Sequence, residues 1–169
     1  SLGFGFAEIG TVTLKPQEGN PKPRIFRVTE SQSIINRLGF NNDGALAIAK
    51  RLENRPKDFV VGANIGKNKT TPLEAAARDY QESFAILCPM VDYITINISS
   101  PNTSGLRSLQ DPILLRGLLK NISHQRMQYR QDSLPIFLKL SPDIDYSDAE
   151  EIVAIVKGEG FSGLILTNT

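Results

Sequence analysis

YITINI at residues 93–98 passes directly into SSPNT at residues 99–103, and this stretch decides the fold. A short, nearly continuous apolar run is typical of a strand buried on both faces of a parallel sheet. The small polar residues that follow stand at the carboxyl end of that strand, which is where α/β proteins bind their ligands. The stretch therefore predicts an α/β protein with its functional site in the loop after this strand.

Four further runs of the same kind predict four more strands. They lie at residues 6–12, 59–65, 136–140 and 163–167. Helical patterns separate the later runs: one begins with Thr71 as its cap, one begins at Asp111, and one follows Ser147. Residues 13–28 are rich in Pro and Gly, which predicts an excursion or hairpin inserted after the first strand.

Polar residues stand at the ends of the later runs: Asn64, Asn97, Lys139 and Asn168. Successive members are 33, 42 and 29 residues apart, which are the spacings of βα units with parallel strands and right-handed crossovers. A doubly wound sheet places ligands only at its switch point, whereas a barrel brings all of its strand ends to one mouth. Any single Asn could simply begin a turn, but amides at three strand ends favour a barrel. The predicted fold is a TIM (β/α)8 barrel.

The composition excludes several classes of protein and site. Lys plus Arg is 19 and Asp plus Glu is 18, so the formal charge of +1 offers no basic excess for binding nucleic acid. No apolar run approaches the ~20 residues that a membrane-spanning helix needs. One cysteine, Cys88, excludes an intramolecular disulfide and favours a reducing compartment. His124, the single histidine, lies in a polar helical stretch, where we expect it to be exposed.

The predicted ring of strand-end residues has an unusual chemistry. It contains neutral amides, hydroxyls and one cation, Lys139, but neither a pair of carboxylates nor a histidine for acid–base catalysis. Amides donate and accept hydrogen bonds in fixed directions, so they suit a planar ligand with C=O and N–H groups. We therefore expect the ring to orient a flat ligand and to leave the bond chemistry to a cofactor.

Six short motifs, in unbroken order along the chain, resemble one family. They are EIGTVT (residues 8–13), PQEGNP (16–21), INRLGFN (35–41), NIGKNK (64–69), NISSPNT (97–103) and TNT (167–169). Together they resemble the class 2, quinone-linked dihydroorotate dehydrogenases, which are FMN-dependent barrels. The resemblance implies that this chain covers roughly strands two to six of a TIM (β/α)8 barrel.

The resemblance also implies roles for individual residues. Ser100 matches the catalytic base, which needs a relay through Thr103 and a water, and Phe40 matches an aromatic residue on the substrate side. The implied substrate-binding residues are Asn36, Asn97, Asn102, Asn168 and Thr169. The implied FMN-binding residues are Gly10, Thr11, Asn64, Asn97, Lys139 and Thr167. Among these, the lysine would stabilise the negative charge that the flavin gains on reduction.

The activity implied by the resemblance is the oxidation of dihydroorotate to orotate in de novo pyrimidine biosynthesis. FMN would carry the electrons and a quinone would accept them, at the bacterial cytoplasmic membrane or the mitochondrial inner membrane. A class 1-type soluble dehydrogenase using fumarate or NAD is an alternative, but its base is a cysteine, and Cys88 is predicted on a helix. A non-catalytic barrel fragment is the other alternative.

The expected domain is a partial FMN-binding barrel over residues 1–169. By the resemblance, the first strand and a peripheral membrane and quinone-binding segment would precede Ser1, and the two strands whose loops bind the FMN phosphate would follow Thr169. A piece with open sheet edges is expected to self-associate. Without the phosphate-binding loops, these residues alone are expected to bind FMN poorly and to be inactive.

Overall fold

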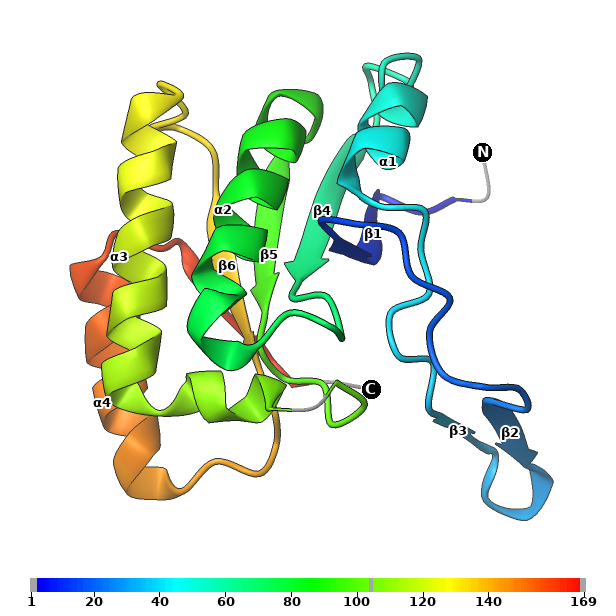
Figure 1. Cartoon of the computed structure of the whole chain (residues 1–169). Coiled ribbons are helices and arrows are strands. Elements are labelled where there is room, and N and C mark those ends of the chain that lie inside the picture. Colours follow the sequence, from blue (N-terminus) through cyan, green and yellow to red (C-terminus); the bar gives the residue numbers. More distant parts are fainter. Residues whose placement is uncertain (1–2, 104, 168–169) are drawn as a thin grey trace.

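A five-stranded parallel sheet organises the computed structural model, which describes residues 3–103 and 105–167. The strands are β1 (Phe6–Thr13), β4 (Val60–Gly66), β5 (Tyr93–Asn97), β6 (Ile136–Leu140) and β7 (Gly163–Leu166). They are neighbours in chain order, without the reversal that defines a doubly wound sheet (Figure 1). This confirms the five predicted strands and their parallel direction, and the uniform progression is that of a barrel wall.

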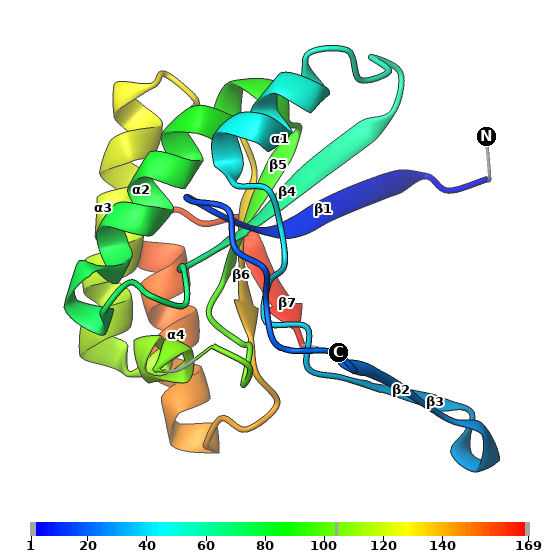
Figure 2. The same cartoon turned by 45° about the vertical axis from the view of Figure 1, so that its right-hand side comes forward.

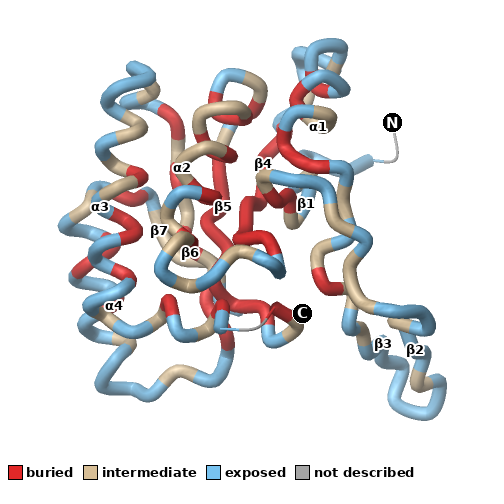
Figure 3. Tube along the Cα trace, viewed as in Figure 1, coloured by how far each residue is buried: buried red, intermediate tan, exposed pale blue. Residues whose placement is uncertain are grey.

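Four helices cover one face of this sheet and pack side by side in chain order (Figures 1 and 2). They are α1 (Ala45–Leu52), α2 (Ala76–Leu87), α3 (Pro112–Gln128) and α4 (Tyr146–Gly158). Every second residue of the central strands, such as Ile94, Ile96 and Leu138, packs against the helices and is fully buried. The hydrophobic core therefore lies between sheet and helices, as the red segments of Figure 3 show.

Helix α3 forms where the sequence predicts it. The Asp111 carboxylate accepts hydrogen bonds from the backbone N–H groups of Ile113 at 3.0 Å and Leu114 at 3.2 Å, and Pro112 occupies the first helical position. Its buried residues recur at helical spacing on one face: Leu115, Leu118, Leu119 and Ile122. His124, on the same helix, is exposed as expected.

Two helical predictions need correction. The helix expected from a Thr71 cap starts instead with the 3₁₀ turn η2 (Leu73–Ala75), and α2 begins only at Ala76, without a side-chain cap. The sequence analysis also missed α1, because it is short and follows Gly44 without a polar capping residue. The helix expected after Ser147 is α4, which begins one residue earlier.

The excursion after β1 is longer than the predicted residues 13–28. It contains an antiparallel hairpin, in which β2 (Ile25–Val28) pairs with β3 (Ser33–Asn36) across the 3₁₀ turn η1 (Thr29–Ser31). The hairpin extends away from the rest of the molecule (Figure 2), and most of its residues are exposed. The chain returns from it to the end of the sheet, which brings Asn36 and Phe40 to the strand ends.

The sheet face opposite the helices carries a layer of aromatic rings. Tyr93 packs edge-on against Phe6, with ring centroids 6.4 Å apart, and against Phe137, at 5.7 Å. Gly62 of the neighbouring strand leaves room for this ring, because a Cβ at that position would come within 2.0 Å of the Tyr93 ring. The glycine is therefore required by the close approach of Tyr93.

We expect Gly62→Ala to destabilise the full-length protein by about 1–3 kcal/mol, because the Tyr93 ring is held from both sides and cannot move away without breaking contacts. Urea unfolding followed by circular dichroism measures this change. Gly117→Ala, in the open space along α3, is the matched control and should be neutral or stabilising by up to about 1 kcal/mol. Equal stability of the two variants would contradict the assigned role of Gly62.

Candidate functional site

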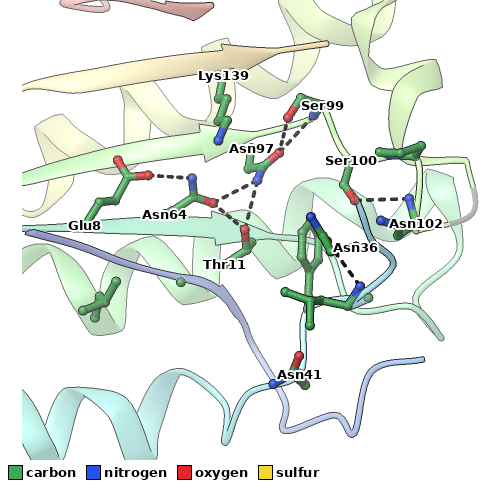
Figure 4. Close-up of a pocket in the computed structure, with 16 residues that line it drawn as sticks. Glu8, Thr11, Asn36, Asn41, Asn64, Asn97, Ser99, Ser100, Asn102 and Lys139 are labelled. Carbon is green, nitrogen blue, oxygen red and sulfur yellow. Dashed lines mark hydrogen bonds between the residues drawn. The ribbon is translucent and has the colours of Figure 1, made fainter. Parts of the chain in front are cut away.

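A cavity of about 310 Å³ opens at the carboxyl ends of the strands (Figure 4). Its walls come from β1 and from the segment that returns from the hairpin, and also from the ends of β4, β5 and β6 and the loop after β5. The predicted site residues that line it are Gly10, Thr11, Asn36, Phe40, Asn64, Asn97, Ser100, Asn102 and Lys139. Residues far apart in the sequence thus meet at one place, at the edge of the sheet where α/β proteins bind ligands.

Two predicted site residues of the described chain are not part of this wall. Thr103 is buried within the loop after β5, and Thr167 is exposed just beyond β7. Asn168 and Thr169 lie outside the described residues. The polar groups that line the cavity in the described chain are amides, hydroxyls, the Glu8 carboxylate and the Lys139 ammonium.

Asn97 is the centre of a hydrogen-bond network that joins three strands. Its Nδ2 donates to Thr11 Oγ1 at 2.9 Å and to Asn64 Oδ1 at 3.1 Å, and the Thr11 hydroxyl donates to the same Asn64 oxygen at 2.7 Å. Its Oδ1 accepts hydrogen bonds from the backbone N–H of Ser99 at 3.0 Å and from the Ser99 hydroxyl at 2.9 Å. The amide nitrogen and the amide oxygen of Asn97 are thus both hydrogen-bonded, so this side chain holds Thr11, Asn64 and Ser99 in place.

A bulge in β1 brings Thr11 into this network. The register of β1 against β4 shifts between Ile9 and Val12, and Gly10 lies in this shift with a φ of 131°. A Cβ on Gly10 would come within 2.5 Å of the Asn64 carbonyl oxygen, so both the conformation and the close approach require glycine.

Glu8 is a site residue that the sequence analysis missed. Its carboxylate accepts a hydrogen bond from Asn64 Nδ2 at 2.9 Å (Figure 4) and one from the Thr95 hydroxyl at 2.7 Å. Burial, the negative charge of Glu8 and a hydrogen bond to it raise the pKa of Tyr93 to about 12. A signal was present in the sequence: Glu8 is a charged residue in an apolar strand, two positions before Gly10 and so on the same face.

The loop after β5 holds the predicted base. Ser100 is 9% exposed, and its Oγ accepts a hydrogen bond from the Asn102 backbone N–H at 3.2 Å. Thr103 is 3% exposed, and its hydroxyl has no hydrogen-bond partner among the described residues. A buried hydroxyl without a partner is uncommon and often binds a water, so Thr103 is available to a proton relay. The Tyr80 hydroxyl braces the start of the loop by donating to the Asn97 carbonyl at 2.7 Å.

A second group of side chains, which we call the clasp and define as Gln17 and Asn68, holds the hairpin's return segment in place. The Asn68 amide exchanges two hydrogen bonds of 2.9 Å with the Lys15 backbone and donates to Gln17 Oε1 at 3.0 Å. Gln17 in turn donates from Nε2 to the Gly39 carbonyl at 2.9 Å. The clasp therefore connects the loop after β4 to residues 36–40, which line the cavity.

A buried lysine supports the clasp. The Lys67 ammonium donates to the carbonyls of Asn68 at 3.1 Å and Thr71 at 2.6 Å, while the Asn68 backbone N–H donates to Asp79 Oδ2 at 2.8 Å. Burial lowers the pKa of Lys67, an effect partly opposed by the negative charge of Asp79. Lys67 is thus engaged in fixing the loop.

The cavity can recognise a ligand more readily than it can perform acid–base chemistry alone. The Lys139 ammonium forms no hydrogen bond or ion pair within residues 3–103 and 105–167, and the side chain extends toward the Asn97 network (Figure 4). Cys88, in the 3₁₀ turn η3 (Cys88–Met90) before β5, is buried at the opposite end of the sheet, and burial raises its thiol pKa to about 11.

Across the described chain, no cluster of His, Cys, Asp and Glu could hold a metal ion, and no helix is long and apolar enough to span a membrane.

Comparison with known proteins places these motifs in one family. The family model for dihydroorotate dehydrogenase matches residues 1–169. A dihydroorotate dehydrogenase (quinone) from Chloroflexus aurantiacus is 47% identical and one from Acidithiobacillus ferrooxidans is 49% identical, each alignment covering 100% of this chain and 48% of the relative. The crystal structure of DHODH from Eimeria tenella in complex with ferulenol matches with a TM-score of 0.91 and 37% identity, over 99% of this chain and 51% of that one. The chain thus spans about half the length of these relatives.

We expect Gln17→Ala to increase amide hydrogen exchange in residues 36–42 by about tenfold or more, because the Gly39 carbonyl, the Asn68 amide and the Lys69 backbone N–H each lose a hydrogen bond worth ~1 kcal/mol. Hydrogen–deuterium exchange with mass spectrometry measures this in the full-length protein, where β4 and β5 should remain equally protected. Gln128→Ala, at the exposed end of α3, is the matched control. Unchanged exchange in residues 36–42 would show that the clasp does not hold them.

Proposed function

This chain belongs to the dihydroorotate dehydrogenase family, a family of flavin-dependent TIM barrels, and on that premise we propose that the full-length protein oxidises dihydroorotate to orotate in de novo pyrimidine biosynthesis. FMN is the proposed electron carrier and a quinone the proposed acceptor. One observation supports this above all: strand ends and a hairpin excursion bring amides, hydroxyls and one lysine to a single cavity. Such a cavity orients a flat ligand but depends on a cofactor for electron transfer.

The free polar groups of the cavity fit the FMN ring. The second N–H of Asn64 and the Lys139 ammonium have no partner within the described chain, so both can donate to a ligand. When bound, FMN supplies a hydride acceptor and takes on negative charge. Lys139 would stabilise that charge, while Gly10, Thr11 and Asn97 would shape the cavity wall beside the ring. Thr167, beyond β7, is the remaining proposed flavin contact.

Dihydroorotate would bind on the side of the cavity formed by the hairpin's return segment and the loop after β5. Asn36 and Asn102 carry amides on this side, and Phe40 provides an apolar surface. Asn97 also belongs to the proposed substrate set, although a direct contact would require it to exchange one of its present hydrogen bonds. Asn168 and Thr169 complete the set proposed from the family motif.

Ser100 is the proposed base. A serine hydroxyl is a weak base at neutral pH, so it must pass its own proton onward as it accepts one from the substrate. The buried Thr103 hydroxyl, which has no partner among the described residues, supports a relay from Ser100 through Thr103 and a water. In this scheme Ser100 in the loop after β5 would remove the proton, while Lys139 and the strand-end residues would hold the flavin that accepts the hydride.

We expect the full-length protein to contain FMN and to oxidise dihydroorotate with a soluble quinone analogue. The printed names of the curated relatives support the quinone, and quinone-dependent members of the family are in general membrane-associated. Steady-state assays with a quinone analogue, fumarate and NAD distinguish this proposal from a class 1-type enzyme. Turnover with fumarate or NAD alone would overturn it.

We expect Ser100→Ala to slow flavin reduction by dihydroorotate about 10²–10⁴-fold, the usual cost of losing a general base, while FMN remains bound. Anaerobic stopped-flow absorbance measures the rate, and the visible spectrum reports the bound flavin. Ser108→Ala, an exposed serine of the 3₁₀ turn η4 (Leu106–Gln110), is the matched control. A normal reduction rate in Ser100→Ala would remove Ser100 from the mechanism.

A further inference from the structure

We propose that Glu8 is a positioning residue that sets the direction of every hydrogen bond in the Asn97 network, and thereby determines which groups of the cavity can donate to the flavin. This inference rests on the proposed function, because it concerns the surface that the flavin would contact. The carboxylate lies on β1, on the cavity wall, and it forms no ion pair within the described part of the chain. Its recorded side-chain partners are the uncharged groups of Asn64, Thr95 and Tyr93.

The two ends of the network have fixed hydrogen-bonding character. An ionised carboxylate only accepts hydrogen bonds, and a backbone N–H only donates them. An amide side chain can turn over and exchange its oxygen and nitrogen, so amides between two such ends take the orientation that the ends impose. Glu8 is the acceptor-only end, and the Ser99 backbone N–H is the donor-only end.

Between these ends each orientation follows from the one before. Because Glu8 accepts, Asn64 must present Nδ2 to it and turn Oδ1 toward Asn97. Asn97 must then present Nδ2 to Asn64 and leave its Oδ1 for the Ser99 N–H. The Thr11 hydroxyl fits the same direction, since it donates to Asn64 and accepts from Asn97. The constraint from β1 and the constraint from the loop after β5 therefore agree.

As a consequence, the cavity wall presents hydrogen-bond donors to a ligand. With Asn64 in this orientation, its oxygen is occupied by Thr11 and Asn97, and its second N–H is the amide group left for a ligand. Lys139 adds a second donor on the neighbouring side. If Asn64 turned over, its oxygen would face Glu8 and its nitrogen would face the Asn97 nitrogen, which opposes two donors. Glu8 thus prevents the cavity wall from presenting acceptors. The carbonyl and ring-nitrogen acceptors of a flavin could not form hydrogen bonds with such a wall.

The decisive experiment exchanges the donor and the acceptor of the Glu8–Asn64 pair in the full-length protein. Asn64→Asp alone places two carboxylates at hydrogen-bond distance and should weaken FMN binding by about 10- to 100-fold. Adding Glu8→Gln restores a donor to the pair: the new amide nitrogen donates to residue 64, and its oxygen still accepts from Thr95. Residue 64 keeps one oxygen for Thr11 and Asn97, so E8Q/N64D should restore the stability of the network. The aspartate introduced by N64D has no N–H left for a ligand, so FMN affinity should stay low in this variant.

The matched control is E150Q/N64D, which has the same net charge but removes an exposed carboxylate on α4. FMN affinity is measured by quenching of flavin fluorescence, and thermal unfolding midpoints are measured on the flavin-free proteins. Recovery of the unfolding midpoint in E8Q/N64D but not in E150Q/N64D, with FMN affinity still reduced in both, is the expected result. Full recovery of affinity in E8Q/N64D would overturn the inference, because the N–H of residue 64 would then not be needed. An unfolding midpoint that stays as low in E8Q/N64D as in E150Q/N64D would also overturn it, because Glu8 would then not direct the network. Failure of the unsubstituted protein to bind FMN would instead overturn the proposed function and this inference together.

Discussion

The register of the parallel sheet is the constraint on which the site depends. Asn64 pairs with Thr95, and Asn97 pairs with Lys139, so Asn64 lies one cavity-facing position before Asn97, and the polar residues of three adjacent strands face the same side of the sheet. A shift of one residue in either pairing would turn these side chains into the hydrophobic core and bring isoleucine or leucine to the cavity. Ile65 and Ile96, each one position away and fully buried against the helices, hold the register in place. The same packing that stabilises the sheet therefore aligns the site.

The sequence predicted the elements that depend on local pattern. Each of the five strands is a short apolar run, and α3 has an Asp111 cap, a proline and a helical repeat, so local sequence and tertiary packing favour the same structure. The site residues at strand ends were predictable for the same reason, since parallel strands bring their carboxyl ends together. The identity of the ligand came only from the family motifs, because amides and hydroxyls are compatible with many flat ligands.

What the sequence did not reveal depends on contacts between distant residues. Glu8 is far in sequence from Asn64 and Thr95, and no pattern within β1 shows which residues its carboxylate will meet. The contacts of the clasp could not be predicted for the same reason, because Gln17 and Asn68 lie in two loops and no sequence periodicity shows that these loops meet. Helix α1 was missed for a local reason, since eight residues without a polar cap give little signal.

The two sides of the cavity differ in what holds them. The side proposed for the flavin consists of strand ends, whose backbone bonds belong to the central sheet and whose side chains bond to one another across β1, β4 and β5. The side proposed for the substrate includes Asn36 and Phe40, which belong to an exposed excursion held by the clasp and by the Gln17–Asn42 backbone pairing. Segments with few buried contacts open at lower free energy than core strands. The excursion side of the cavity should therefore open at lower free energy than the sheet, which would let a ligand enter and leave there while the strand-end network stays intact.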